Sequence, residues 1–250
     1  MGALGRWLML CVAVTCLAVV PTFPALALLV RPILINMTAN GAGSTSQIEV
    51  INDRNRPIAV EVAVNGLALP ERGDPVVTSD KGDEFVIFPQ IARIAPGQRQ
   101  IFRVRWVGDP NLAESKLFMF ATSELPVEIG DRGNTAAVQV LYAIQSVVAV
   151  APVRARSAVS LASVRRATGK GGAKGLEFTF ANAGAAHGFV TNARLEIKAG
   201  EWSKTLGPPE LNNGFGLGVV PANARRVMFL AVPDLPDNGD VSASFELTDG

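Results

Sequence analysis

The sequence predicts an all-β protein built from two immunoglobulin-like sandwich domains. Three observations support this class: segments that alternate apolar and polar residues recur along the chain, clusters of glycine, proline, asparagine and aspartate separate them, and no stretch has a sustained 3.6-residue apolar period. Seven such segments in roughly 120 residues are typical of an immunoglobulin-like sandwich.

Residues 1–27 are expected to form a secretory signal peptide. Arg6 is their only charge, residues 8–20 are almost entirely apolar, and Ala25-Leu26-Ala27 supplies a small-x-small cleavage pattern. The apolar run is shorter than the ~20 residues that a membrane-spanning helix needs. We therefore expect cleavage, export, and no membrane insertion of the remaining chain.

Removing this segment changes the chemistry available to the protein. Arg6 is lost, so 22 basic residues (23 − 1) balance 22 acidic ones, and both cysteines (Cys11 and Cys16) are lost as well. A neutral chain argues against a nucleic-acid partner, and an exported chain without disulfides fits a bacterial periplasm. With His187 as the only histidine, we expect no enzyme activity, no metal site and no cofactor.

The first domain is expected over residues 28–152. Turn residues such as Asn40-Gly41 and Pro96-Gly97 separate its strands. The segment after Pro96-Gly97 carries arginines on its non-apolar positions, so it is predicted to be a half-exposed strand. The expected strands cover residues 30–37, 46–51, 58–64, 85–94, 98–106, 117–123 and 136–150.

The second domain is expected over residues 153–250, because the long last strand of the first half ends at Pro152. Its clearest strands are predicted over residues 176–181, 193–199, 227–232 and 241–247. Two glycine-rich segments, 165–175 and 212–218, are predicted to be loops.

The strand at residues 136–150 is unusually long and has no charged side chain. As an edge strand it would recruit other chains, since long apolar edges are normally blunted by charge, proline or bulges. A central, buried strand would tolerate the same side chains, and the pattern alone leaves both readings open. One face of this strand carries Val138, Val140, Tyr142 and Ile144.

Four motifs follow one another along the first domain, and their order and spacing are informative. They are Asn52-Asp53 with Pro57; Pro89-x3-Arg93-Ile94-x-Pro96-Gly97 with Gln100 and Arg103; Glu114-Ser115, Phe118 and Glu124-Leu125-Pro126; and the apolar strand that ends before Pro152. Together they resemble the periplasmic chaperones of chaperone–usher pilus assembly, with a first strand similar to the divergent, archaic branch.

The resemblance implies two immunoglobulin-like domains in an L shape, in the periplasm. It implies that residues 138–144 complete a pilin subunit by strand addition, with Val138, Val140, Tyr142 and Ile144 as the donor residues, before delivery to an outer-membrane usher. Strand addition combines backbone hydrogen bonds with apolar side chains that fill pockets.

One departure from the family concerns the pilin carboxylate. Well-known members of the family hold the C-terminal carboxylate of the pilin with an arginine on the first strand and a lysine late on the donor strand. This pair does not carry over to the present sequence, and members of the archaic branch also lack a simple version of it. Arg31, Arg103 and Arg105 are the candidate contacts. The alternative function is a periplasmic or surface structural protein of two sandwiches without a pilin client.

Overall fold

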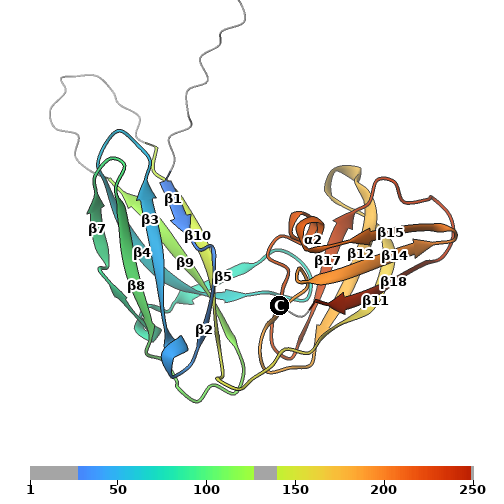
Figure 1. Cartoon of the computed structure of the whole chain (residues 1–250), viewed down its shortest axis with the longest axis horizontal. Coiled ribbons are helices and arrows are strands. Elements are labelled where there is room, and N and C mark those ends of the chain that lie inside the picture. Colours follow the sequence, from blue (N-terminus) through green and yellow to red (C-terminus); the bar gives the residue numbers. More distant parts are fainter. Residues whose placement is uncertain (1–27, 127–139, 249–250) are drawn as a thin grey trace, which may run out of the picture.

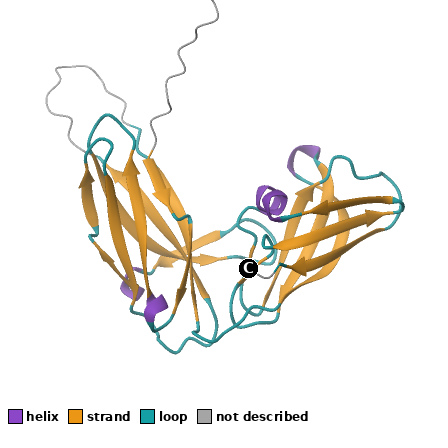
Figure 2. Ribbon diagram, viewed as in Figure 1, coloured by secondary structure: helices purple, strands orange, loops and turns teal. Residues whose placement is uncertain are grey.

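The computed structural model describes residues 28–126 and 140–248, which form two β-sandwich domains set at an angle to each other (Figure 1). Strands dominate both domains, as Figure 2 shows. The expected signal peptide and Val138 lie outside the described residues. The all-β class with two immunoglobulin-like sandwiches in an L shape is confirmed.

The first domain packs a four-stranded sheet against a six-stranded sheet. The four-stranded sheet has the order β1 (Leu28–Arg31), β3 (Thr45–Asn52), β8 (Arg99–Trp106), β6 (Phe85–Phe88). The other sheet has the order β2 (Leu34–Thr38), β10 (Ala143–Ala151), β9 (Lys116–Leu125), β4 (Ile58–Ala68), β5 (Val76–Asp80), and β7 (Ile91–Ile94) also pairs with β4. Two short 3-10 helices, η1 (Ala42–Ser44) and η2 (Gly82–Glu84), join strands.

The alternating pattern of the sequence places the core between these two sheets. Ile48, Ile58, Phe102 and Phe120 are fully buried there, because every second side chain of a strand faces the same side. Every strand pair of the domain is antiparallel except β10 with β2.

Two expected strands are each broken by a proline. The segment 30–37 divides into β1 and β2 around Pro32, and 85–94 divides into β6 and β7 around Pro89. A proline has no backbone N–H to give to a ladder, so pairing ends there. The first break moves the chain between sheets, since β1 pairs with β3 and β2 pairs with β10.

The second domain also has two main sheets. They are β11 (Val159–Thr168), β12 (Lys174–Asn182), β17 (Ala224–Ala231), and β15 (Trp202–Leu206), β14 (Ala193–Ala199), β18 (Val241–Leu247), with a small pair β13 (Gly188–Phe189) and β16 (Val219–Val220). Phe178, Phe180, Leu195 and Ile197 are fully buried in its core. The expected loop at 165–175 is partly strand, because β11 continues to Thr168 and the 3-10 helix η3 (Lys170–Gly172) makes the turn.

The prediction of a loop over residues 212–218 is partly wrong. The helix α2 (Pro208–Phe215) begins before this segment and includes its first half. Prolines occupy the first turn, where a missing N–H costs nothing. The Glu210 carboxylate accepts a hydrogen bond from the Gly207 N–H at 3.0 Å, and Leu211 is fully buried in the core of the domain. The helix is short and irregular in sequence, which is why periodicity did not reveal it.

Candidate functional site

The strand β10 changes from an edge strand to a central strand along its length. Its second half, Val147–Ala151, pairs with β2 on one side and β9 on the other. Its first half, from Ala143 to Ser146, pairs with β9 alone. The two readings of the sequence therefore each hold for one half of the strand, because β2 is too short to cover all of it.

Apolar side chains are exposed at the open end of this strand. Val140, Leu141 and Tyr142 precede β10, and their side chains are 59%, 42% and 47% exposed. Ile144 is half-buried and packs against the core of the first domain. We name residues 140–146 the open edge. Unpaired backbone beside exposed apolar side chains is the surface that an extended partner strand requires.

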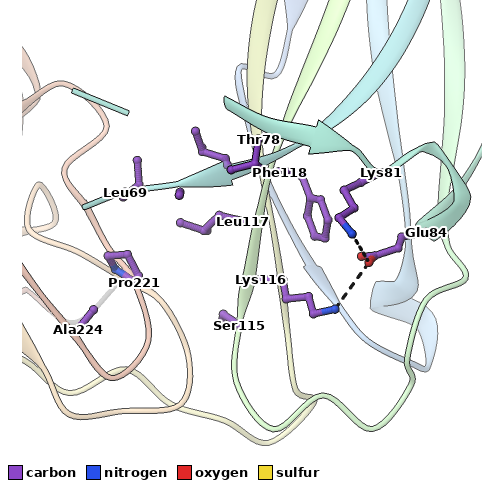
Figure 3. A pocket seen from close by; sticks show the side chains of 13 residues that line it. Leu69, Thr78, Lys81, Glu84, Ser115, Lys116, Leu117, Phe118, Pro221 and Ala224 are labelled. Carbon is purple, nitrogen blue, oxygen red and sulfur yellow. Dashed lines mark ion pairs between the residues drawn. The ribbon is translucent and has the colours of Figure 1, made fainter. Parts of the chain in front are cut away.

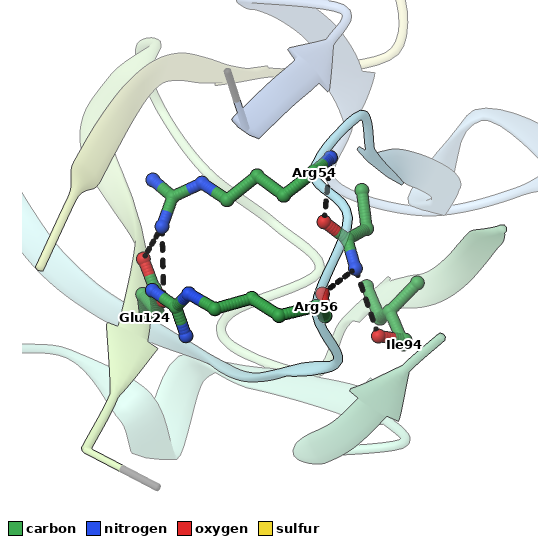
Figure 4. Close-up of polar contacts among 5 residues, drawn as sticks. Arg54, Arg56, Ile94 and Glu124 are labelled. Atoms are coloured by element: carbon green, nitrogen blue, oxygen red, sulfur yellow. Dashed lines mark hydrogen bonds and ion pairs between the residues drawn. The ribbon is translucent and has the colours of Figure 1, made fainter. Parts of the chain in front are cut away.

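A buried ion-pair cluster joins Arg54, Arg56 and Glu124 (Figure 4) and lies next to Tyr142 of the open edge. Arg56 Nη2 lies 2.6 Å from Glu124 Oε1, and Arg54 Nη1 lies 3.0 Å from Glu124 Oε2. The Glu124 backbone N–H donates to the Tyr142 carbonyl at 2.8 Å. Neither arginine was predicted from the sequence to belong to a site, because their shared partner Glu124 is about 70 residues away in the chain.

The three candidate carboxylate contacts lie on the four-stranded sheet. Arg31 ends β1 beside the open edge, because the Pro32 carbonyl that follows it accepts a hydrogen bond from Ser146 Oγ at 3.2 Å. Arg31 forms an ion pair with Glu49, which also pairs with Arg99 at 3.1 Å. The Arg31 side chain, through its hydrogen bond, is the main cause of a lowered pKa for Glu49. Arg103 and Arg105 are exposed on β8. The strand β8 does not pair with β10, so Arg103 and Arg105 are not on the sheet that carries Ile144.

An apolar seam joins the two domains. Its buried residues come from the outer face of the six-stranded sheet and from β16: Leu67, Leu117, Met119, Ala149 and Val219. A cavity of about 220 Å³ lies in this seam, between Met119 and Val147 of the first domain and Phe215 and Arg226 of the second.

Arg226 is the cation of this cavity, and no motif of the sequence pointed to it. Burial lowers its pKa. Its Nη1 donates to the Pro70 carbonyl at 2.6 Å, whereas its Nε is buried with no hydrogen-bond partner. The available signal was the pair Arg225–Arg226 at the start of the apolar strand β17, because neighbouring residues of a strand face opposite sides and one of the two arginines must face inward.

Polar contacts also cross the seam. The β4–β5 hairpin extends toward the second domain (Figure 1), where Arg72 forms two 2.9 Å hydrogen bonds with Glu177. His187 Nε2 lies 3.0 Å from Asn36 Oδ1, and its Nδ1 lies 3.2 Å from Ser115 Oγ. Burial lowers the pKa of His187. The histidine therefore has a structural position between the domains.

A second, more open groove runs beside the seam and is drawn in Figure 3. Lys81 and Lys116 each lie 3.7 Å from Glu84, which stands between them. Both lysines are partly exposed, so these pairs are solvated and weak. The groove adds charge beside the seam, and one Glu84 oxygen, Oε2, is buried there without a hydrogen-bond partner.

Among residues 28–126 and 140–248, no group of histidine, cysteine, aspartate and glutamate side chains is placed to hold a metal ion. The same residues include no helix that is both long and apolar enough to span a bilayer.

The chain resembles known proteins in sequence over its first half and in fold over most of its length. The family model for the N-terminal domain of PapD, a pili and flagellar-assembly chaperone, matches residues 30–154, half of the chain. The crystal structure of the YadV chaperone superposes with a TM-score of 0.54 at 11% identity, covering 87% of this chain and 91% of that chain.

Two further solved structures show the same two-domain fold. The class 5 fimbriae chaperone CfaA superposes with a TM-score of 0.52 at 9% identity, covering 87% of this chain and 99% of that chain. The Salmonella enterica SafA pilin in complex with the SafB chaperone gives 0.50 at 15% identity, covering 91% and 99%. A search of the curated proteins found no match.

Proposed function

The chain belongs to the PapD family of pili and flagellar-assembly chaperones, and we propose that it binds pilin subunits by donating residues 138–144 as an added strand. Members of this family are chaperones and not enzymes. The solved structure of a SafA pilin with the SafB chaperone is a complex of the proposed kind. The observation that carries the proposal is the open edge of β10, with exposed apolar side chains beside unpaired backbone.

Strand addition uses both features of the open edge. The backbone from Ala143 to Gln145 has β9 on one side only, so a subunit strand can pair on the other side; at Ser146 that side is closed by a hydrogen bond to the Pro32 carbonyl. Val140 and Tyr142 are two residues apart, so they would project to one face once the segment is added to the subunit as a strand. Full burial of each apolar side chain in a subunit groove contributes about 1.5–3 kcal/mol. Val138 continues this alternation and remains a predicted donor residue.

The experiment is co-purification from the periplasm with the pilin subunit encoded beside the chaperone. The variant Val140→Asp with Tyr142→Asp should lose the complex, because the change at Val140 would bury a carboxylate without a partner and both changes remove apolar donor side chains. The matched control is Val86→Asp with Phe88→Asp. These residues are also exposed apolar residues of the first domain, at 53% and 72%, but they lie on the opposite sheet.

The control variant should bind the subunit like the wild type. A complex that survives the changes at Val140 and Tyr142 would contradict donation of this segment. Failure of the wild type to recover any pilin would instead favour a structural sandwich protein without a client.

We further propose that the C-terminal carboxylate of the subunit reaches the seam and contacts Arg226. The cavity there lies along β10 through Val147, and Arg226 has a buried Nε without a partner. Arg103 and Arg105 lie on the other sheet, and Arg31 already forms an ion pair with Glu49, so these three are the weaker candidates. Arg226→Gln should weaken the complex, whereas Arg225→Gln, a change at the exposed neighbour, should not. Equal affinities would exclude this anchor.

Export and delivery complete the proposed function. Residues 1–27 would direct the chain to the periplasm and be removed there. An outer-membrane usher would then accept the subunit, which gains better packing from a neighbouring subunit's strand, so no ATP is needed. Deleting the usher gene should make the chaperone–subunit complex accumulate in the periplasmic fraction, and an unchanged amount would argue against delivery to an usher.

A further inference from the structure

The loop between β3 and β4 aims two arginines at one carboxylate. Asn52 is fully buried, and its Oδ1 accepts from the Arg54 backbone N–H at 3.1 Å. Its Nδ2 donates to the carbonyls of Arg56 at 2.8 Å and Ile94 at 3.0 Å. The side-chain amide therefore fixes the loop, and both arginine side chains point back to Glu124 (Figure 4).

This cluster carries an uncompensated positive charge. The Glu124 side chain is fully buried, and the Arg54 side chain is only 9% exposed. Within the part of the chain that the structure describes, the ion pairs of Arg54 and Arg56 are with Glu124 alone. Two guanidinium groups share one carboxylate, so one unit of charge has no counter-ion within these ion pairs. The Arg56 side chain is 32% exposed and its charge is partly solvated, so the cost of burial falls mainly on Arg54, which a further anion would compensate.

One edge of the Arg54 guanidinium is free. Its Nη1 contacts both oxygens of Glu124, at 3.2 and 3.0 Å. Its Nε and Nη2 are buried and have no hydrogen-bond partner. These two nitrogens form one edge of the guanidinium plane, and their N–H bonds point in parallel. That edge is the fork which binds a carboxylate through two hydrogen bonds.

Tyr142 packs over the face of the same guanidinium. The Arg54 Cζ atom lies 4.6 Å from the centroid of the Tyr142 ring, a cation–π contact. Tyr142 is a residue of the open edge, and its ring is on the segment that we propose is donated. Movement of this ring into a subunit would remove one covering group from Arg54.

We propose that the Nε–Nη2 edge of Arg54 binds an aspartate or glutamate side chain of the bound subunit, and that Tyr142 covers Arg54 until its segment is donated. This inference rests on the proposed function, since the subunit supplies the carboxylate. It adds a charged, directional contact at one end of an otherwise apolar strand exchange. Such a contact would favour subunits with an acidic residue at that end of the groove.

A first test uses the free chaperone with acetate as the probe. Tyr142→Ala removes the ring that packs over Arg54. In this variant acetate should raise the unfolding midpoint more than chloride does at the same ionic strength, and the difference should level off as the acetate site fills. Tyr142→Ala with Arg54→Gln should show no such excess. An acetate response that is equal with and without Arg54 would overturn the site, whatever the client proves to be.

NMR signals of the Tyr142 ring report its contact with Arg54 directly. Tyr142 is the only tyrosine of the chain, so tyrosine-labelled protein gives one set of ring signals in an NMR spectrum. Those signals should shift in Arg54→Gln and on binding of the pilin subunit. Ring signals that Arg54→Gln leaves in place would show that the two side chains are not in contact in solution.

The third test measures affinity for the pilin subunit. A charge-assisted hydrogen-bond pair predicts a loss of tenfold to about a hundredfold in Arg54→Gln. Arg54→Lys keeps a positive charge beside Glu124 but lacks the two parallel N–H donors of a guanidinium. Its affinity for the subunit should therefore lie between those of the wild type and Arg54→Gln. Arg99→Gln is the control, since Arg99 is 69% exposed and pairs with Glu49.

The outcomes separate the two proposals. A subunit that binds Arg54→Gln and Arg54→Lys like the wild type, but does not bind Val140→Asp with Tyr142→Asp, would refute the carboxylate site and leave strand donation intact. If Arg54→Gln does not fold, Arg54→Lys alone decides, because wild-type affinity in that variant would exclude the two-bond contact.

Discussion

Phe85 and Phe88 lie on the same short strand, β6, and predict opposite outcomes for the same substitution. Phe85 is 6% exposed, whereas Phe88 is 72% exposed. The Phe85 ring centroid lies 5.1 Å from Trp106 and 4.9 Å from both Phe118 and Phe120, each in an edge-to-face arrangement. Phe85→Ala therefore removes the centre of an aromatic cluster in the first domain.

The expected loss for Phe85→Ala is about 3–5 kcal/mol of unfolding free energy. Three aromatic pairs, each adding about 0.5–1.5 kcal/mol beyond burial, place the value toward the upper end. With an m value near 2 kcal/mol/M in urea, the unfolding midpoint of the first domain should fall by roughly 2 M. Phe88→Ala should change the unfolding free energy by no more than about 0.5 kcal/mol.

Urea unfolding followed by tryptophan fluorescence measures both variants. Trp106 reports the first domain, because its ring packs against Phe85; a Trp202→Phe background removes the signal of the second domain. Equal losses from Phe85→Ala and Phe88→Ala would refute the assignment of the inner and outer faces of β6. A negligible loss from Phe85→Ala would refute the cluster as the core of the first domain.

Three further predictions concern charged groups. Glu124→Ala should cost about 3–5 kcal/mol in urea unfolding, because it leaves two arginines without their buried partner, whereas Glu61→Ala, at an exposed site, should cost nearly nothing. Arg72→Glu should widen the distance distribution between spin labels on the two domains, and adding Glu177→Arg should restore it; no change in the single variant would mean that this contact does not fix the angle. Burial lowers the pKa of His187, so the folded state favours the neutral ring. Its stabilising effect is complete above the unfolded pKa of about 6.5 and is lost as the pH falls below that value. The wild type should therefore lose unfolding free energy between pH 7 and 5 more steeply than His187→Gln, and parallel curves would contradict this.

The fold class followed from the sequence because strand alternation and turn residues are local signals. The core faces of β3, β4 and β8 agree with the period-2 pattern. The breaks at Pro32 and Pro89 were missed, although proline is a local signal, because the flanking residues continued the alternation. Which sheet each piece joins depends on tertiary pairing, and no local pattern contains that information.

The candidate site was only partly accessible from the sequence. The apolar run ahead of Ile144 was visible, but its change from edge to centre depends on where β2 ends. The contact of Arg54 with Glu124 joins residues far apart in the chain, and Arg226 gains its position only when the second domain docks on the first. Arginines are frequent on exposed strands, so residue type alone did not separate these from Arg103.

Amide hydrogen exchange of the open edge tests the central claim most directly. In the free chaperone the backbone from Val140 to Ser146 should exchange faster than Val148, which lies between β2 and β9. Binding of the pilin subunit should slow exchange across Val140–Ser146 and leave Val148 unchanged. An intact complex in which these amides exchange as fast as in the free chaperone would contradict strand donation.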